Sequence, residues 1–173
     1  MNRKIVKMLK EKSGIMLDLG CGGNKQSGFV GMDIRQMPGV DIVHDVERVP
    51  YPLPDCCCSK ILLSHLIEHI CPKKVFGLMN ELWRITKPEG ILMISTPYGG
   101  SRGFWQDPTH CHGWVENTAI YFDPKPIMLG DQFNILYNIY KPKPWKILQN
   151  NWFATGNMEI VLQRREEETN EKA

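Results

Sequence analysis

The stretch Leu17-Asp18-Leu19-Gly20-Cys21-Gly22 indicates the fold of this 173-residue chain. It ends an apolar run that begins at Ile15, and a short apolar run bounded by turn residues is typical of a buried strand. Glycine directly after such a strand lets the backbone turn sharply and lets a ligand approach closely, because glycine has no Cβ. Nucleotide-type ligands bind at this carboxyl end of a parallel strand. The stretch therefore predicts a ligand-binding turn in an α/β protein.

A second short strand is predicted from Phe29 to Met32, and it is followed by the acid Asp33. A carboxylate at the end of the neighbouring strand can accept two hydrogen bonds from a ribose diol. Six residues separate Gly22 from Phe29. A helix of average length has about eleven residues, so this first crossover is predicted to be a compressed loop with its helix short or absent.

The rest of the chain predicts one α/β domain over residues 1–165. Further strands are expected at Val40–His44, Lys60–Leu63, Ile91–Thr96, Phe133–Ile139 (which Lys146–Leu148 could extend) and Met158–Gln163. A helix from about Pro72 to Lys87 has apolar residues at helical spacing and a proline suited to its first position. Residues 98–131 are predicted to form an irregular inserted lobe, with at most a short helix near Glu116–Tyr121. The polar, acidic tail 166–173 is expected to be disordered.

Composition narrows the classes of function. The net charge of +2 gives no strong field for nucleic acid, so nucleic acid is an improbable partner. No apolar run approaches the roughly 20 residues needed to span a bilayer, which argues against a membrane partner. Three of the six cysteines are adjacent, at 56–58, whereas a disulfide scaffold would space them out. We therefore expect reduced thiols and a cytoplasmic location.

Three segments together resemble class I S-adenosylmethionine-dependent methyltransferases. They are the loop Asp18–Gly22, the segment Leu63-Ser64-His65-Leu66-Ile67-Glu68-His69, and the helix and turn Glu81–Gly90, in which Glu89 stands where a glycine often occurs. The resemblance implies a Rossmann-like, mostly parallel sheet with an antiparallel edge strand. It also implies S-adenosylmethionine as the cofactor and methyl transfer as the activity.

The resemblance also implies which residues bind the cofactor. The glycine turn would hold the methionine part, Asp33 the ribose hydroxyls and Asp45 the adenine amino group. The full set implied is Asp18, Gly20, Cys21, Gly22, Asp33, Ile34, Asp45, Val46, Leu63, Ser64 and His65.

On the acceptor side, Asp107-Pro108-Thr109-His110 resembles a segment that follows the fifth strand in some of these methyltransferases. Histidine titrates near neutral pH, so His110 is the candidate base, and Asp107 could orient it. The methyl acceptor is expected to be a small molecule or a sugar-like compound. The alternative is a protein that binds S-adenosylmethionine but serves as an inactive regulatory or partner subunit, which the shortened crossover favours.

A metal site and a nicotinamide site are less well supported. The segment His65–His69 also fits the H-x-x-E-H pattern of zinc peptidases, but that chemistry needs a stable helix, and strand-like residues precede this segment. His110, Cys111 and His112 are adjacent, and adjacent ligands rarely share one tetrahedral site. We therefore predict no metal site. A nicotinamide site would need the spacing G-x-G-x-x-G, which the chain lacks.

Overall fold

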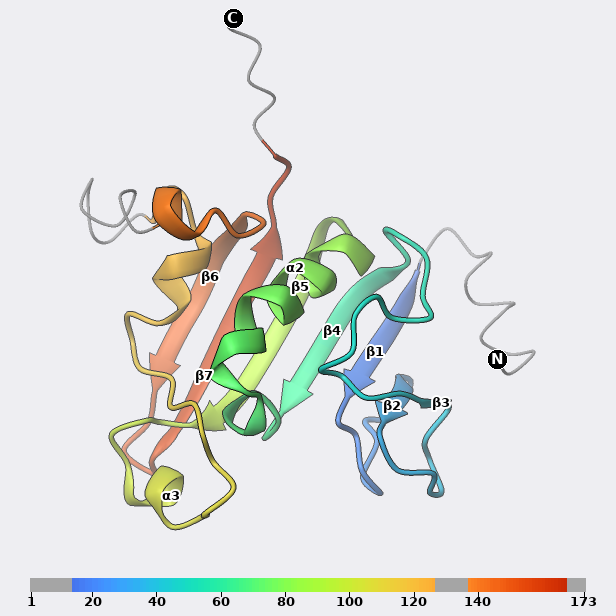
Figure 1. Ribbon diagram of the computed structural model, residues 1–173, viewed down its shortest axis with the longest axis horizontal. Coiled ribbons are helices and arrows are strands. Elements are labelled where there is room, and N and C mark those ends of the chain that lie inside the picture. Colours follow the sequence, from blue (N-terminus) through green and yellow to red (C-terminus); the bar gives the residue numbers. More distant parts are fainter. Residues whose placement is uncertain (1–13, 127–136, 168–173) are drawn as a thin grey trace, which may run out of the picture.

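The computed structural model describes residues 14–126 and 137–167 (Figure 1). Within these residues, seven strands form one sheet in the order β3-β2-β1-β4-β5-β7-β6. The strands are β1 (Ile15–Leu19), β2 (Val30–Asp33), β3 (Ile42–Val43), β4 (Cys58–Ser64), β5 (Thr86–Pro97), β6 (Trp145–Trp152) and β7 (Asn157–Arg164). The strands β1 to β5 pair in parallel with one another, whereas β7 runs antiparallel to both β5 and β6. The predicted α/β fold, mostly parallel with an antiparallel edge, is confirmed.

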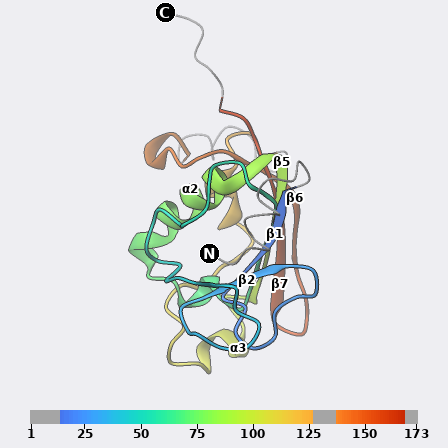
Figure 2. The ribbon, with the colours of Figure 1, turned by 90° about the vertical axis from the view of Figure 1, so that its right-hand side faces the viewer.

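The main helix is α2 (Val75–Ile85), which connects β4 to β5 and lies on one side of the sheet (Figure 2). Pro72 opens a 3-10 turn, η2 (Pro72–Lys74), that leads directly into it. The apolar side of α2 packs on alternate sheet residues, because successive strand side chains point to opposite faces. Ile61 and Leu63 on β4 and Leu92 and Ile94 on β5 are accordingly at most 2% exposed.

The loop 20–29 between β1 and β2 contains no helix, as the spacing predicted. The loop lies directly against β2 at Gly31. A Cβ at that position would come within 2.7 Å of both Cys21 Sγ and Lys25 Cδ, so only glycine leaves room. Lys25 also pairs with Asp41 at 2.6 Å, next to β3. This close packing lets ten residues make a connection that usually needs about a dozen.

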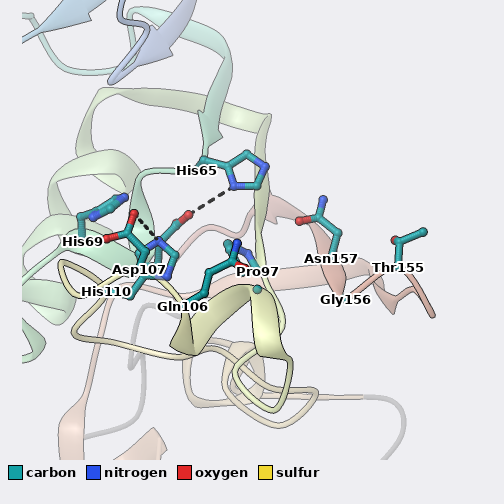
Figure 3. Close-up of a pocket in the computed structure, with 11 residues that line it drawn as sticks. His65, His69, Pro97, Gln106, Asp107, His110, Thr155, Gly156 and Asn157 are labelled. Carbon is teal, nitrogen blue, oxygen red and sulfur yellow. Dashed lines mark ion pairs between the residues drawn. The ribbon is translucent and has the colours of Figure 1, made fainter.

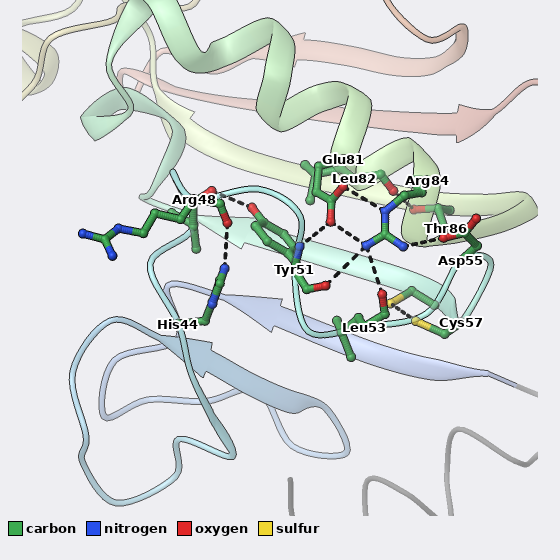
Figure 4. A network of polar contacts seen from close by, with 12 residues as sticks. His44, Arg48, Tyr51, Leu53, Asp55, Cys57, Glu81, Leu82, Arg84 and Thr86 are labelled. Atoms are coloured by element: carbon green, nitrogen blue, oxygen red, sulfur yellow. Dashed lines mark hydrogen bonds and ion pairs between the residues drawn. The ribbon is translucent and has the colours of Figure 1, made fainter.

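A polar network joins the segment before β4 to α2 (Figure 4). Glu81 accepts a hydrogen bond from the Tyr51 amide at 2.6 Å, and it pairs with Arg84 Nη2 at 2.6 Å. The same guanidinium nitrogen donates to the Leu53 carbonyl at 3.0 Å. Hydrogen bonds to Glu81 and Asp55 raise the pKa of Arg84, which keeps its guanidinium group charged. This network holds a helix-free connection against the sheet.

Several predicted boundaries were wrong. The helix ends at Ile85 rather than Lys87, because the backbone from Thr86 already pairs with Cys58. β3 has only two residues. Part of the predicted strand Phe133–Ile139 lies outside the described residues, and the described part, 137–140, is helical; the strand before the last begins instead at Trp145.

The lobe after β5 is more ordered than expected. It contains a short helix, α3 (Arg102–Trp105), that the sequence did not predict, capped by the Ser101 hydroxyl. A 3-10 turn, η3 (Ala119–Phe122), overlaps the expected helix near Glu116–Tyr121. Tyr98 and Trp114 also pair in an isolated bridge that closes the lobe.

Candidate functional site

The carboxyl ends of β1, β2 and β4 bring the predicted cofactor residues together. Leu19 is paired with Met32 on one side and with Leu63 on the other. Gly20 is therefore next to Asp33 on β2 and next to Ser64 on β4. A parallel sheet aligns these strand ends at one edge, which is where such folds bind ligands.

The glycine turn and Asp33 face one another. The Gly22 amide donates to Asp33 Oδ2 at 3.0 Å, and Arg35 donates to Oδ1 through its amide at 2.9 Å and its Nε at 3.2 Å. Burial raises the pKa of Asp33, but these hydrogen bonds outweigh it and hold the pKa below its usual range. A carboxylate has about four lone-pair sites, so one on Oδ2 remains for a ligand hydroxyl.

Asp18 holds the loop between β1 and β2 and does not face the open edge of the sheet. Its Oδ2 accepts the Gln26 amide at 2.8 Å, while the residue is only 4% exposed. Burial is the main reason that the pKa of Asp18 is raised. The neighbouring Cys21 is buried beside both acids, and its pKa is raised to about 11, so its thiol stays protonated.

The two glycines of the turn differ in how closely other side chains approach them. Gly20 and Gly22 have φ of +66° and +50°, a conformation that glycine adopts without strain. Nothing lies closer than 3.6 Å to a Cβ placed at Gly22, but a Cβ at Gly20 would meet Leu66 Cδ1 at 2.7 Å. A side chain at Gly22 would thus meet only the end of Arg35, whereas the flexible end of Leu66 fills the space over Gly20. No pattern in the sequence predicted this contact.

Four other predicted cofactor residues fall into two groups. Ile34 is 63% exposed beside Asp33, and His65 is exposed at the end of β4, so both can contact a ligand. Val46 and Leu63 belong to the core cluster, so their side chains serve packing. Asp45 belongs to neither group. Its side chain closes a turn by accepting a hydrogen bond from the Glu47 amide at 3.0 Å, and it pairs with Arg48.

A cavity of about 360 Å³ lies beside this edge, at the ends of β4 and β5 (Figure 3). Its titratable side chains are His65, Glu68, His69, Asp107 and His110. The structure thus brings His110 and Asp107, predicted from the lobe, next to the end of β4. Glu68 and His69 were part of a sequence pattern that we considered and set aside.

His110 is held by the backbone rather than by Asp107. Its Nδ1 is 2.8 Å from the Phe104 carbonyl, whereas its Nε2 is 3.8 Å from Asp107 Oδ2, too far for a hydrogen bond. Asp107 instead accepts the Thr109 hydroxyl at 2.7 Å and the Thr109 amide at 2.8 Å. These two hydrogen bonds hold the pKa of Asp107 below its usual range.

By sequence, no protein-family model and no curated protein matches the chain. By structure, it is similar to a SAM-dependent methyltransferase from Archaeoglobus fulgidus, with a TM-score of 0.60 at 17% identity over 94% of this chain and 90% of that chain. It is also similar to the 1,6-didemethyltoxoflavin-N1-methyltransferase of Burkholderia thailandensis, solved with S-adenosylhomocysteine, with a TM-score of 0.58 at 10% identity over 87% and 71%. The [4+2]-cyclase SpnF is a further match, with a TM-score of 0.56 at 13% identity over 87% and 74%.

These comparisons define the fold of class I S-adenosylmethionine-dependent methyltransferases, and they confirm the resemblance seen in the sequence at the level of the fold. The cyclase among the similar structures illustrates that a shared fold does not specify one reaction. Among the described residues, no helix is both long enough and apolar enough to cross a membrane.

Proposed function

We propose that this chain is an S-adenosylmethionine-dependent methyltransferase that acts on a small-molecule or sugar-like acceptor. The observation that carries the proposal is the hydrogen bond from the Gly22 amide to Asp33 Oδ2. It places the glycine turn and the carboxylate of the next strand face to face, as a nucleoside site at the end of a parallel sheet requires. The net charge of +2 supports a small acceptor over a nucleic acid.

The residues at this edge suit the parts of the cofactor. Asp33 would hold the ribose hydroxyls, and the exposed Ile34 would pack on the adenine. Asp18 would act through the loop that it holds at the Gln26 amide. Ser64 and His65, both exposed at the end of β4, would line the side nearest the cavity. S-adenosylmethionine, when bound, supplies a methyl group already activated on a sulfonium, so the protein mainly aligns the acceptor and excludes water.

On the acceptor side, we assign His110 as the base. The Phe104 carbonyl can only accept, so His110 Nδ1 carries the proton and Nε2 keeps its lone pair. That lone pair can take a proton from an acceptor group in the cavity. Asp107 would position His69 rather than His110, because Thr109, which Asp107 holds by two hydrogen bonds, lies 3.0 Å from His69 Nδ1.

A second candidate is a subunit that binds S-adenosylmethionine without turning it over. The contact of Leu66 with Gly20 and the helix-free first crossover support this candidate. Binding of S-adenosylmethionine with no S-adenosylhomocysteine formed, in the presence of extracted small metabolites, would favour it over the enzyme.

Calorimetric titration of S-adenosylmethionine tests the cofactor site. Asp33→Ala should weaken binding at least about tenfold, since a hydrogen bond to a charged group contributes roughly 1.5–3 kcal/mol. Asp55→Asn is the matched control, because Asp55 pairs with Arg84 far from the glycine turn and its side chain is 74% exposed. Equal affinities of the wild type and Asp33→Ala would remove Asp33 from the site.

A further inference from the structure

Three side chains that can donate electron pairs meet at one end of the cavity. One ligand atom from each of Glu68, His69 and His110 lies within 4.8 Å of the others. The two imidazole rings meet edge to face, with their centroids 4.7 Å apart. What this cluster can bind depends on where its protons are.

His69 keeps a lone pair on Nε2, as His110 does. The Thr109 hydroxyl donates its single proton to Asp107 Oδ1 at 2.7 Å. Thr109 Oγ1 must therefore accept from His69 Nδ1, which lies 3.0 Å away. Both histidines thus have their Nδ1 proton engaged by an outer partner, which is how histidine ligands of metals are commonly oriented.

Glu68 completes the cluster with a buried oxygen that lacks a hydrogen bond. The residue is 0% exposed, and its Oε2 accepts the Thr96 hydroxyl at 3.1 Å. Oε1 accepts no hydrogen bond, and the ring nitrogen Nδ1 of His65 is 3.4 Å from it. A buried carboxylate oxygen that accepts no hydrogen bond is costly, and a cation in the cavity would reduce that cost.

We propose that Glu68, His69 and His110 form a binding site for a divalent transition-metal ion of the zinc type. Two imidazoles and one carboxylate are a known zinc ligand set, and such a site keeps one position open. Bonds of about 2.1 Å space tetrahedral ligands about 3.4 Å apart, so each side chain must move inward by less than about 1 Å. His69 is exposed, so its ring has room for this adjustment.

The sequence pattern H-x-x-E-H was set aside because strand-like residues, and not a stable helix, precede it. The helix is indeed missing, since Ile67–His69 forms only a 3-10 turn, η1. The third ligand comes from the lobe instead, where the Phe104 carbonyl holds His110 and the Thr109 hydroxyl contacts His69. The ligand set is thus assembled by the fold and not by one helix.

The open position of the ion would face the cavity and select an acceptor with a hydroxyl or carboxylate oxygen. This part of the inference rests on the proposed function, whereas ion binding itself does not. The ion takes the Nε2 lone pair assigned to the base, so His110 is a ligand, and not a base, whenever the ion is bound.

Titration of the chelator-treated, untagged chain with Zn²⁺ by calorimetry, and with Co²⁺ by visible absorption, tests the site. The wild type should bind one ion per chain. His69→Ala and His110→Ala should each bind at least tenfold more weakly, and His69 is exposed, so its variant is expected to fold. Cys111→Ser, next in the chain to His110, and His44→Ala, whose ring contacts the Arg48 carbonyl, should bind as the wild type does.

Three results would overturn the proposal: no one-to-one binding by the wild type, equal affinity in His110→Ala, or a thiolate-to-cobalt charge-transfer band, which would assign the ion to cysteines. Circular dichroism of each variant establishes that it is folded. Titration of S-adenosylmethionine into the metal-free chain separates the two proposals. If the ion fails to bind and S-adenosylmethionine still binds, the metal site is refuted and the proposed function stands.

Discussion

At the scale of single residues, the backbone conformation at Glu89 conflicts with its side chain. Glu89 has φ of +58°, in the turn between α2 and the paired part of β5. Side chains with a Cβ are strained there, at a cost of about 1–2 kcal/mol. The resemblance to methyltransferases placed a glycine at this position, and the structure gives the physical reason for that preference.

Glu89→Gly is expected to stabilise the protein by about 0.5–1 kcal/mol, because relief of this strain exceeds the entropy that glycine adds to the unfolded chain. Urea unfolding measures the difference. Glu89→Ala is the control, since it removes the carboxylate but keeps the Cβ. If the alanine variant gains as much as the glycine variant, charge and not backbone strain is responsible.

At the scale of elements, Glu47 joins the segment after β3 to the start of η2. Its Oε1 accepts the Cys71 amide at 2.7 Å, and its Oε2 accepts Lys74 Nζ at 2.8 Å. The hydrogen bond from Lys74 is the main reason that the pKa of Glu47 lies below its ordinary value of 4.5, followed by the bond from Cys71. The contact satisfies a backbone donor at the turn that starts the only long helix among the described residues.

The pH dependence of stability should report this contact. A carboxyl whose pKa is lowered in the folded state stabilises above its unfolded pKa, and that stabilisation is lost as the pH falls through the folded pKa. Glu47→Gln should therefore cost about 1 kcal/mol near neutral pH and less at about pH 3. Denaturant unfolding at several pH values measures this, with Glu116→Gln as the exposed control. A cost that stays constant with pH would contradict an ionic role for Glu47.

At the scale of the whole molecule, the proposed cofactor site joins three strand ends that are distant in sequence. A ligand that binds there stabilises the folded chain by mass action. At about 100 times the dissociation constant, the gain is about 2.7 kcal/mol. S-adenosylmethionine should therefore raise the Tm by roughly 5–10 °C.

Thermal unfolding followed by circular dichroism checks this shift. Asp33→Ala should lose most of the shift, and Asp55→Asn should keep it. An unchanged Tm of the wild type at saturating S-adenosylmethionine would count against binding at this edge of the sheet.

The sequence by itself determined the parallel sheet, the glycine turn after the first strand and the missing first helix. These features depend on local rules: apolar runs, glycines after a strand, and a spacer too short for a helix. The predicted edge strand at 133–139 was wrong where the structure describes it, at 137–139, because alternation is a local pattern. Pairing with β7 selected 145–152 instead.

Only the tertiary structure decided what surrounds the site. Leu66 over Gly20, the Phe104 carbonyl at His110, and the cluster of Glu68 with two histidines all join residues from different elements. The lobe after β5 folds back onto η1 through the bonds of the Cys111 and His112 amides to the Glu68 carbonyl, at 2.9 and 3.1 Å. Periodicity reports which face of an element is buried, but it carries no information on which distant segment covers that face.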